Sequence, residues 1–198
     1  MISFVFDTET TGLPVKHAPA SHPDQPEILQ LCGMLCDDTR VYSMFNVYVH
    51  GDTPVPDSAF QVHRIDREMT ARVGITRTRM VQIFSSFAEK ADVIVGHNLQ
   101  YDMLMMRVAM IRENGKPDRI NQILGRTSYC TMQNSTQICK IPHAKPRRPD
   151  DYKWPSLQEA YKKLVDPRGF EGAHDAFADV TATYDVYKVL RQGTNAGV

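Results

Sequence analysis

Two carboxylates, Asp7 and Glu9, lie two residues apart near the start of the chain. They follow a short apolar run, residues 2–6, which is typical of a strand buried on both faces. Because side chains alternate along a strand, both acids point to the same side. Two converging buried acids cost free energy unless a cation neutralises them. Their hard oxygen ligands favour Mg²⁺ or Mn²⁺ over Zn²⁺.

A third acid, Asp102, falls in the first turn of a helix predicted over residues 98–113. Stabilisation of the positive end of that helix would by itself explain an acid here. Its neighbours, residues 101 and 103–106, are almost all apolar, which indicates a helix packed into protein. A partly buried acid of this kind needs a partner.

His174 and Asp179 form an H-x-A-x-x-D pattern at the start of the last predicted helix. We expect His174 near the N-cap, and Asp179 about one and a half turns inside the helix. Small residues at 173, 176 and 178 allow another element to approach closely. A lone histidine at this place would be a capping or surface residue, and only the other acids make it a candidate for chemistry.

The elements that must position these residues follow from hydrophobic patterning. Residues 27–35 and 41–49 predict a β-hairpin around the turn residues 37–40, and residues 92–96 predict another buried strand. An apolar stripe over residues 80–88 predicts a helix that Thr76 or Thr78 would cap. Three further helices are predicted over residues 98–113, after the capping residue Ser156, and over residues 175–191. Three prolines place residues 142–149 in a loop. Strands followed by alternating helices and strand indicate an α/β fold with a central mixed β-sheet flanked by helices.

Length and composition set limits on the class of protein. The 198 residues fit a single domain, 1–198, with 42% hydrophobic and 23% charged residues. Apolar runs are too short to span a membrane, and the opening run lacks a basic leader, so we expect an intracellular, cytoplasmic protein. Four scattered cysteines predict buried free thiols. Net charge is zero, with an acidic first half and a basic second half, which is compatible with a metal site beside a basic substrate path or with an uneven surface.

Three segments together resemble a known family. Residues 6–13 (FDTETTGL), 96–102 (GHNLQYD) and 174–179 (HDAFAD) are similar, in order and spacing, to the three motifs of the DnaQ-like (DEDDh) 3′-to-5′ exonucleases of the RNase H-like superfamily. Residues 60–66 and 153–157 are secondary matches to segments of this family. Tyr101 stands where phenylalanine is frequent, and His174 indicates the subgroup with a catalytic histidine.

The resemblance implies an RNase H-like fold that hydrolyses phosphodiester bonds with two Mg²⁺ ions, for which Mn²⁺ can substitute. Asp7 would bridge both ions, Glu9 and Asp179 would complete one site, and Asp102 would hold the other. His174 would be the general base for the attacking water, a role that suits imidazole near neutral pH. The products would be nucleoside 5′-monophosphates released from a 3′ end.

Substrate contacts are also implied by the resemblance. The turn formed by Thr10, Thr11, Gly12 and Leu13 would meet the terminal nucleotide, Asn98 would approach its backbone, and Tyr101 would line the same site. Leu13 as core filler and Asn98 as a helix cap are the structural alternatives. The basic loop 143–149 would contact phosphates or would be a solvated loop.

The preferred substrate on this basis is single-stranded DNA or another 3′ end. An exoribonuclease similar to oligoribonuclease or ribonuclease T shares the same motifs, and no motif encodes the distinction at the 2′ position. A noncatalytic nucleic-acid-binding module and a small-molecule phosphodiesterase are the remaining alternatives. A replication or repair protein is a possible partner, and no sequence feature defines the oligomeric state.

Overall fold

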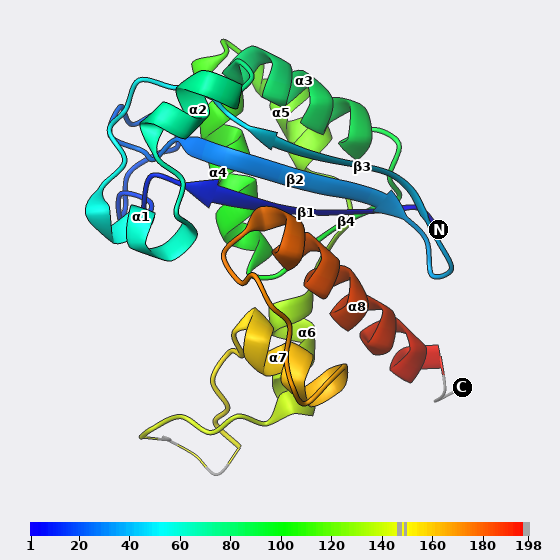
Figure 1. The fold of residues 1–198 in the computed structure, drawn as a ribbon. Coiled ribbons are helices and arrows are strands. Elements are labelled where there is room, and N and C mark those ends of the chain that lie inside the picture. The colour runs from blue at the N-terminus through cyan, green and yellow to red at the C-terminus, as the bar shows by residue number, and fades with distance from the viewer. Residues whose placement is uncertain (146–147, 149, 196–198) are drawn as a thin grey trace.

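The computed structural model describes residues 1–145, 148 and 150–195, and its core is one mixed sheet (Figure 1). The strand order is β3-β2-β1-β4-β5. β1, β2 and β3 pair antiparallel, whereas β4 pairs parallel with both β1 and β5. The strands are β1 (Ser3–Thr10), β2 (Ile28–Cys36), β3 (Val41–Tyr48), β4 (Val93–Gly96) and β5 (Ser128–Cys130). The structure therefore confirms the predicted α/β fold.

Helices cover both faces of this sheet (Figure 1). They are α1 (Asp57–His63), α2 (Arg67–Val73), α3 (Arg77–Ala88), α4 (Leu99–Arg112), α5 (Pro117–Leu124), α6 (Thr131–Cys139), α7 (Leu157–Leu164) and α8 (Ala176–Asn195). α3 and α4 contact β2 and β1 from one face, and α8 contacts them from the other. The central strands β1, β2 and β4 are consequently buried on both sides, as their apolar residues require, whereas the edge strand β3 is partly exposed.

The alternation of β1 divides the core in two. Phe4 and Phe6 pack with α3 and α4, and the ring of each contacts Phe84. Val5 packs on the opposite face with Val180 and other residues of α8. Asp7 and Glu9 continue the series of Val5, so the buried core fixes the direction in which both acids point.

Most predicted elements are confirmed within a residue or two. β1 extends to Thr10, so Asp7 and Glu9 lie near its end, as predicted. Asp179 lies in the first turn of α8 rather than one and a half turns inside, because Asp175 caps this helix by accepting the N–H groups of Phe177 and Ala178. Patterning did not predict the short elements α1, α2, α5, α6 and β5, which contain too few residues to establish a period.

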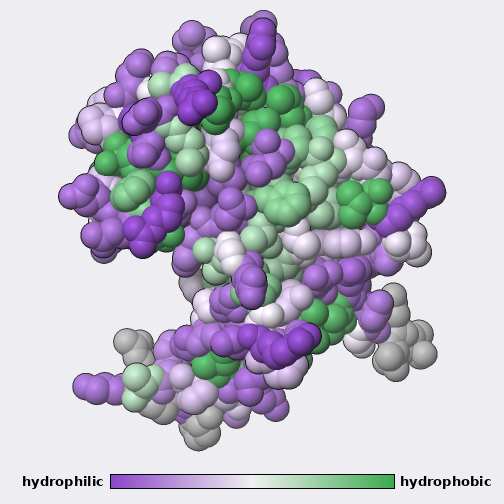
Figure 2. All heavy atoms as spheres, viewed as in Figure 1, coloured by the Kyte–Doolittle hydropathy of each residue, from purple (hydrophilic) through white to green (hydrophobic). Residues whose placement is uncertain are grey.

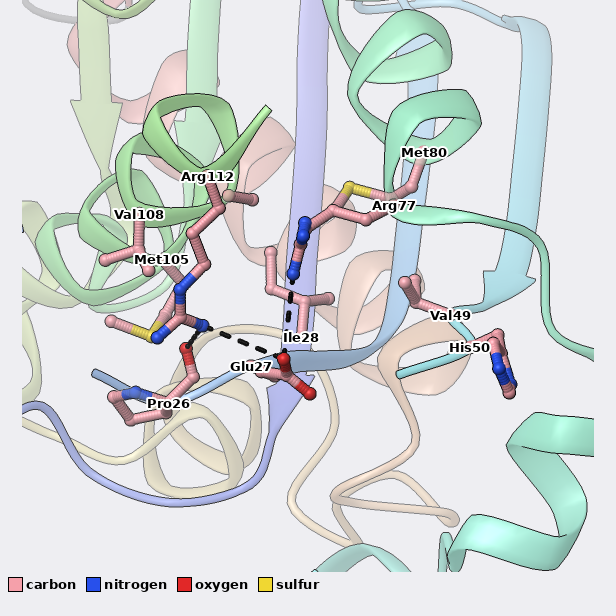
Figure 3. A pocket seen from close by; sticks show the side chains of 11 residues that line it. Pro26, Glu27, Ile28, Val49, His50, Arg77, Met80, Met105, Val108 and Arg112 are labelled. Carbon is pink, nitrogen blue, oxygen red and sulfur yellow. Dashed lines mark hydrogen bonds and ion pairs between the residues drawn. The ribbon is translucent and has the colours of Figure 1, made fainter. Parts of the chain in front are cut away.

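The segment between β1 and β2 is anchored by Glu27 (Figure 3). Three arginines surround its carboxylate, with shortest nitrogen–oxygen distances of 2.9, 3.6 and 4.0 Å for Arg67, Arg77 and Arg112. Arg112 also donates to the backbone carbonyls of residues 23, 25 and 26. Thr11 pairs with the backbone of Glu27, so this cluster also holds the turn that follows β1.

On the face shown in Figure 2, hydrophilic side chains surround a hydrophobic area on the part built on the sheet, and the molecule narrows between that part and the part formed by α6 and α7. Among the described residues, no helix is both long and apolar enough to cross a membrane. All four cysteines are buried and free, as predicted.

Candidate active site

A cleft of about 450 Å³ opens where β1 and β4 end. Asp7 and Glu9 of β1 reach it from the strand face that also contacts α8. The loop before α8 contributes His174, the first turn of α8 contributes Asp179, and α4 contributes Asp102. The structure therefore brings together the five residues that were predicted from three separate segments.

Asp102 is held by Thr8, the strand residue between Asp7 and Glu9. Its Oδ1 accepts both the hydroxyl of Thr8, at 2.6 Å, and the backbone N–H of Thr8, at 3.1 Å. Thr8 points to the α4 side of β1, opposite to Asp7 and Glu9. These two hydrogen bonds from Thr8 make it the partner that the buried Asp102 requires. The function of Thr8 was not predicted, although its place inside the first motif was a signal.

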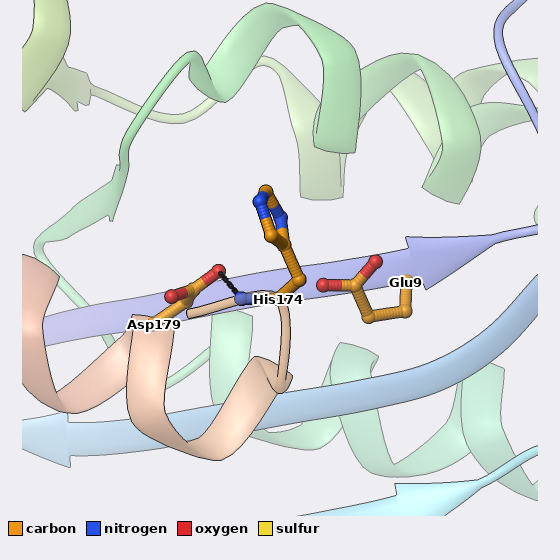
Figure 4. Close-up of side chains that lie close together, drawn as sticks. All are labelled: Glu9, His174 and Asp179. Carbon is orange, nitrogen blue, oxygen red and sulfur yellow. Dashed lines mark hydrogen bonds between the residues drawn. The ribbon is translucent and has the colours of Figure 1, made fainter. Parts of the chain in front are cut away.

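The loop before α8 brings His174 to Glu9, and the first turn of α8 brings Asp179 to the same place (Figure 4). One potential ligand atom from each of these three side chains lies within 4.8 Å of the others. His174 has a left-handed backbone with φ of 70°, and its N–H donates to Asp179 Oδ2 at 3.2 Å. Its imidazole is exposed in the cleft. This conformation holds the ring beside the acids.

Gln30 joins the start of α8 to the sheet. It is a fully buried polar residue in the otherwise apolar β2. Its Nε2 lies 3.4 Å from Asp175 Oδ2, and its Oε1 accepts the N–H of Ala176 at 3.3 Å. Sequence reasoning missed this residue, but one amide in a run of apolar strand residues was the available signal.

The four carboxyl groups of the cleft have raised pKa values. Burial, together with the charges of the neighbouring acids, raises the pKa of Asp7 well above its usual range. Burial also raises the pKa of Glu9 to about 8 and that of Asp102 to about 7, although the bonds from Thr8 oppose the shift of Asp102. It raises the pKa of Asp179 to about 6, against the bond from His174. Clustered acids of this kind are stable as anions only when positive charge is supplied.

The donor set fits divalent cations. It consists of carboxylate oxygens with a nearby imidazole, which suit Mg²⁺ or Mn²⁺. Asp179 Oδ1 is buried and has no hydrogen-bond partner among the residues that the structure describes. A buried carboxylate oxygen without a donor is costly, and a cation would satisfy it.

The turn after β1 is braced from two sides. The Tyr101 hydroxyl donates to the carbonyl of Gly12 at 2.9 Å and also contacts the hydroxyl of Thr10. His63 accepts the N–H of Ile65 at Nδ1, so its Nε2–H donates to the carbonyl of Thr10 at 3.2 Å. Gly12 has φ of 155°, which favours glycine. Tyr101 therefore lines the cleft and positions the turn. The contribution of His63 to holding this turn was not predicted from the sequence.

The structural alternatives for two candidate contacts can now be judged. Leu13 is 84% exposed, so the alternative that it fills the core is wrong. Asn98 occupies the N-cap position of α4, but its side chain makes no capping bond and is exposed at the cleft. In the predicted basic loop, Pro146, Arg147 and Pro149 lie outside the described residues, and Arg148 is exposed.

Replacing Glu9 by glutamine is expected to stabilise the metal-free protein at alkaline pH. The pKa of Glu9 rises from 4.5 to about 8 on folding, so the folded state retains a proton that the unfolded state releases. The corresponding stability is complete below pH 4.5 and is lost as the pH rises through about 8. Glutamine does not titrate. At about pH 9 the variant should melt about 2–8 °C above the wild type.

Thermal unfolding followed by circular dichroism in EDTA, from about pH 5 to about pH 9, measures this difference. Glu68→Gln, on the exposed side of α2, is the matched control and should show no pH-dependent gain. A difference between Glu9→Gln and wild type that does not widen with pH would contradict the electrostatic description of the cleft.

The strand order of the sheet and the acids clustered at the ends of its central strands are those of an RNase H-like fold. The sequence profile of the exonuclease family RNase_T matches residues 4–187. The chain therefore belongs to this family and is a DnaQ-like exonuclease, a hydrolase. It is 28% identical over 193 residues to the uncharacterized exonuclease CP81 of Escherichia phage 186, covering 94% of this chain and 87% of that protein.

Solved structures show the same fold. Exonuclease I of E. coli in complex with a dT13 oligonucleotide has a TM-score of 0.75 and 18% identity, and the match covers 98% of this chain and 42% of exonuclease I. The zinc-bound form of an E. coli exonuclease I complex with single-stranded DNA has a TM-score of 0.74 and 17% identity, covering 98% and 41%. This chain thus spans about two fifths of the length of those structures.

Proposed function

We propose that this exonuclease degrades single-stranded DNA from the 3′ end and releases nucleoside 5′-monophosphates. The observation that carries the proposal is the convergence of four carboxylates with raised pKa values and one exposed histidine on a single cleft. We further propose that residues 1–198 form one exonuclease domain.

Asp7, Glu9, Asp102 and Asp179 would hold two Mg²⁺ ions, or Mn²⁺ as a substitute. The unpartnered Asp179 Oδ1 and the raised pKa values support cation binding at these acids. The zinc-bound similar structure is also compatible with a divalent-cation site. Two such ions supply activation of water on one side of a phosphodiester and charge neutralisation of the departing oxygen on the other.

The chain's own residues would position substrate and move a proton. His174 presents an exposed imidazole beside Glu9 and Asp179, where it can accept the proton of the attacking water. The braced turn of Thr10, Thr11, Gly12 and Leu13 would receive the terminal nucleotide, with exposed Leu13 against its base. Asn98 and Tyr101 at the cleft wall would complete this contact.

DNA is the preferred substrate because the similar structures of exonuclease I are complexes with DNA oligonucleotides. RNA is the second candidate, since cleavage at a 3′ end uses the same acids for either sugar. The presence of all five predicted residues in one cleft argues against a noncatalytic binding module. A small phosphodiester is a further candidate substrate for the same cleft. A replication or repair protein is a candidate partner of the enzyme.

Digestion of matched 5′-labelled DNA and RNA oligonucleotides in Mg²⁺, resolved on a gel, tests this function. We expect a ladder of products shortened from the 3′ end. Shortening should be faster for DNA than for RNA, and it should not occur in EDTA. Mn²⁺ should restore the reaction after chelation. Failure of folded protein to shorten either oligonucleotide in Mg²⁺ or Mn²⁺ would overturn the proposal, and hydrolysis of a model diester alone would favour a small-molecule substrate.

A further inference from the structure

The single tryptophan of the chain, Trp154, is exposed in the wall of the cleft. Its exposed fraction is 64%, although it is one of the largest apolar side chains in the protein. It belongs to the irregular segment that enters α7, and it shares the cleft with the acids and His174. A large aromatic surface left in water beside a binding cleft is well suited to cover an apolar or aromatic part of a ligand.

The backbone that carries Trp154 is fixed on both sides. The N–H of Lys153 donates to the carbonyl of Ile141 at 2.9 Å. The carbonyl of Pro155 accepts from Nε2 of His97 at 3.0 Å, and burial lowers the pKa of His97 to about 4, which keeps this ring neutral. Ser156 and Glu159 then form a capping box at the start of α7. The indole is therefore presented by a rigid segment, which limits the conformational entropy lost on stacking.

Trp154 and the turn after β1 are held by different elements around the acids. The turn is bonded to Glu27, just before β2, to His63 of α1 and to Tyr101 of α4. The Trp154 segment is bonded instead to His97, which directly follows β4. β1, which carries Asp7 and Glu9, lies between β2 and β4. A strand whose terminal nucleotide occupies the turn would therefore continue across the acids toward Trp154.

We propose that Trp154 stacks on the base of the nucleotide immediately upstream of the bond that is cut. This inference rests on the proposed function and specifies how that cleft holds its substrate. Stacking on an aromatic face tolerates any base, because every base has a π-face. Trp154 would thus hold the strand in place without selecting its sequence.

Fluorescence tests this contact without any turnover, because no second tryptophan contributes. In EDTA, we expect a thymidine oligonucleotide to quench the emission of Trp154 on binding. The same oligonucleotide with an abasic site at the penultimate position should quench much less, whereas an abasic site farther upstream should not matter. Equal quenching by the normal oligonucleotide and by the one lacking the penultimate base would overturn the proposal.

Kinetics of variants provide the second test. Trp154→Ala should raise KM for the oligonucleotide about 10-fold, with Trp154→Phe in between. The loss should be smaller on the p-nitrophenyl ester of thymidine 5′-monophosphate, which lacks an upstream base. On the substrate with a penultimate abasic site, wild type and Trp154→Ala should have similar KM values. Tyr42→Ala, at an exposed aromatic on β3, is the matched control and should change nothing.

The outcomes separate the two proposals. If wild-type protein shortens the oligonucleotide and Trp154→Ala has the same KM, the stacking contact is wrong and the exonuclease proposal stands. If wild-type protein with metal shortens no oligonucleotide, the exonuclease proposal fails, and the fluorescence result then decides whether Trp154 contacts a base at all.

Discussion

Replacing Asp7 by asparagine should lower the rate of nucleotide release by at least ~10³-fold. Asp7 lies in β1 among the other acids, whose charges contribute to its raised pKa. Asparagine keeps the shape of the side chain but removes the negative charge that would hold the cations. Loss of several kcal/mol of charge stabilisation in the transition state corresponds to a rate decrease of this order. The measurement is the initial rate of shortening of a 5′-labelled oligonucleotide at saturating Mg²⁺.

Asp118→Asn provides the matched control, since it makes the same change at an exposed acid in the first turn of α5. Its rate should equal that of the wild type. In EDTA at neutral pH, the Asp7→Asn protein should melt no lower than the wild type, because the substitution removes a carboxylate whose charged form is unfavourable in the fold. Folded Asp7→Asn protein that retains most of the wild-type rate would show that Asp7 does not hold the catalytic ions.

Replacing His174 by alanine should lower the same rate by about 10²–10⁴-fold, the usual contribution of a general base. The imidazole is exposed in the cleft, and the structure places it within reach of Glu9 and Asp179. Its removal should leave the acids and their cations in place, so binding of Mn²⁺ should be retained. Because the vacated space is open to solvent, added imidazole should restore part of the rate.

His22→Ala is the comparison variant, because His22 lies in the segment before β2 and outside the cleft. It should show neither the loss of rate nor the response to imidazole. If His174→Ala loses the rate together with Mn²⁺ binding, His174 is a metal ligand rather than the proton acceptor. Full activity of His174→Ala would exclude both roles.

The loss expected for Asp7→Asn and the gain expected for Glu9→Gln have one physical origin. The fold places four carboxylates where burial raises their pKa values, which costs stability in the absence of cations. The same arrangement is the one that we propose holds divalent ions. We therefore expect removal of one of these charges to favour the metal-free fold while it abolishes the chemistry.

The sequence by itself was sufficient for the identities of the acids and for the elements that carry them. Residues 2–6 are apolar, so β1 had to be buried, and the period of two then placed Asp7 and Glu9 on one face. The stripe over residues 80–88 similarly predicted α3, and Ser156 predicted the start of α7. These features are local, because they depend on periodicity and capping within one segment.

Only the tertiary structure decided which side chains support the acids. Thr8 holds Asp102, Gln30 holds the start of α8, and His97 holds the segment of Trp154. Each of these hydrogen bonds joins residues that are far apart in the chain, so no local pattern encodes it. The exposure of Leu13 and Trp154 was equally undetermined, because an apolar residue is usually buried, and only the packing of its surroundings shows that it is not. Local periodicity thus determined the elements and the face of β1 that carries two of the acids, whereas long-range packing determined the geometry of the cleft and the position of Trp154 within it.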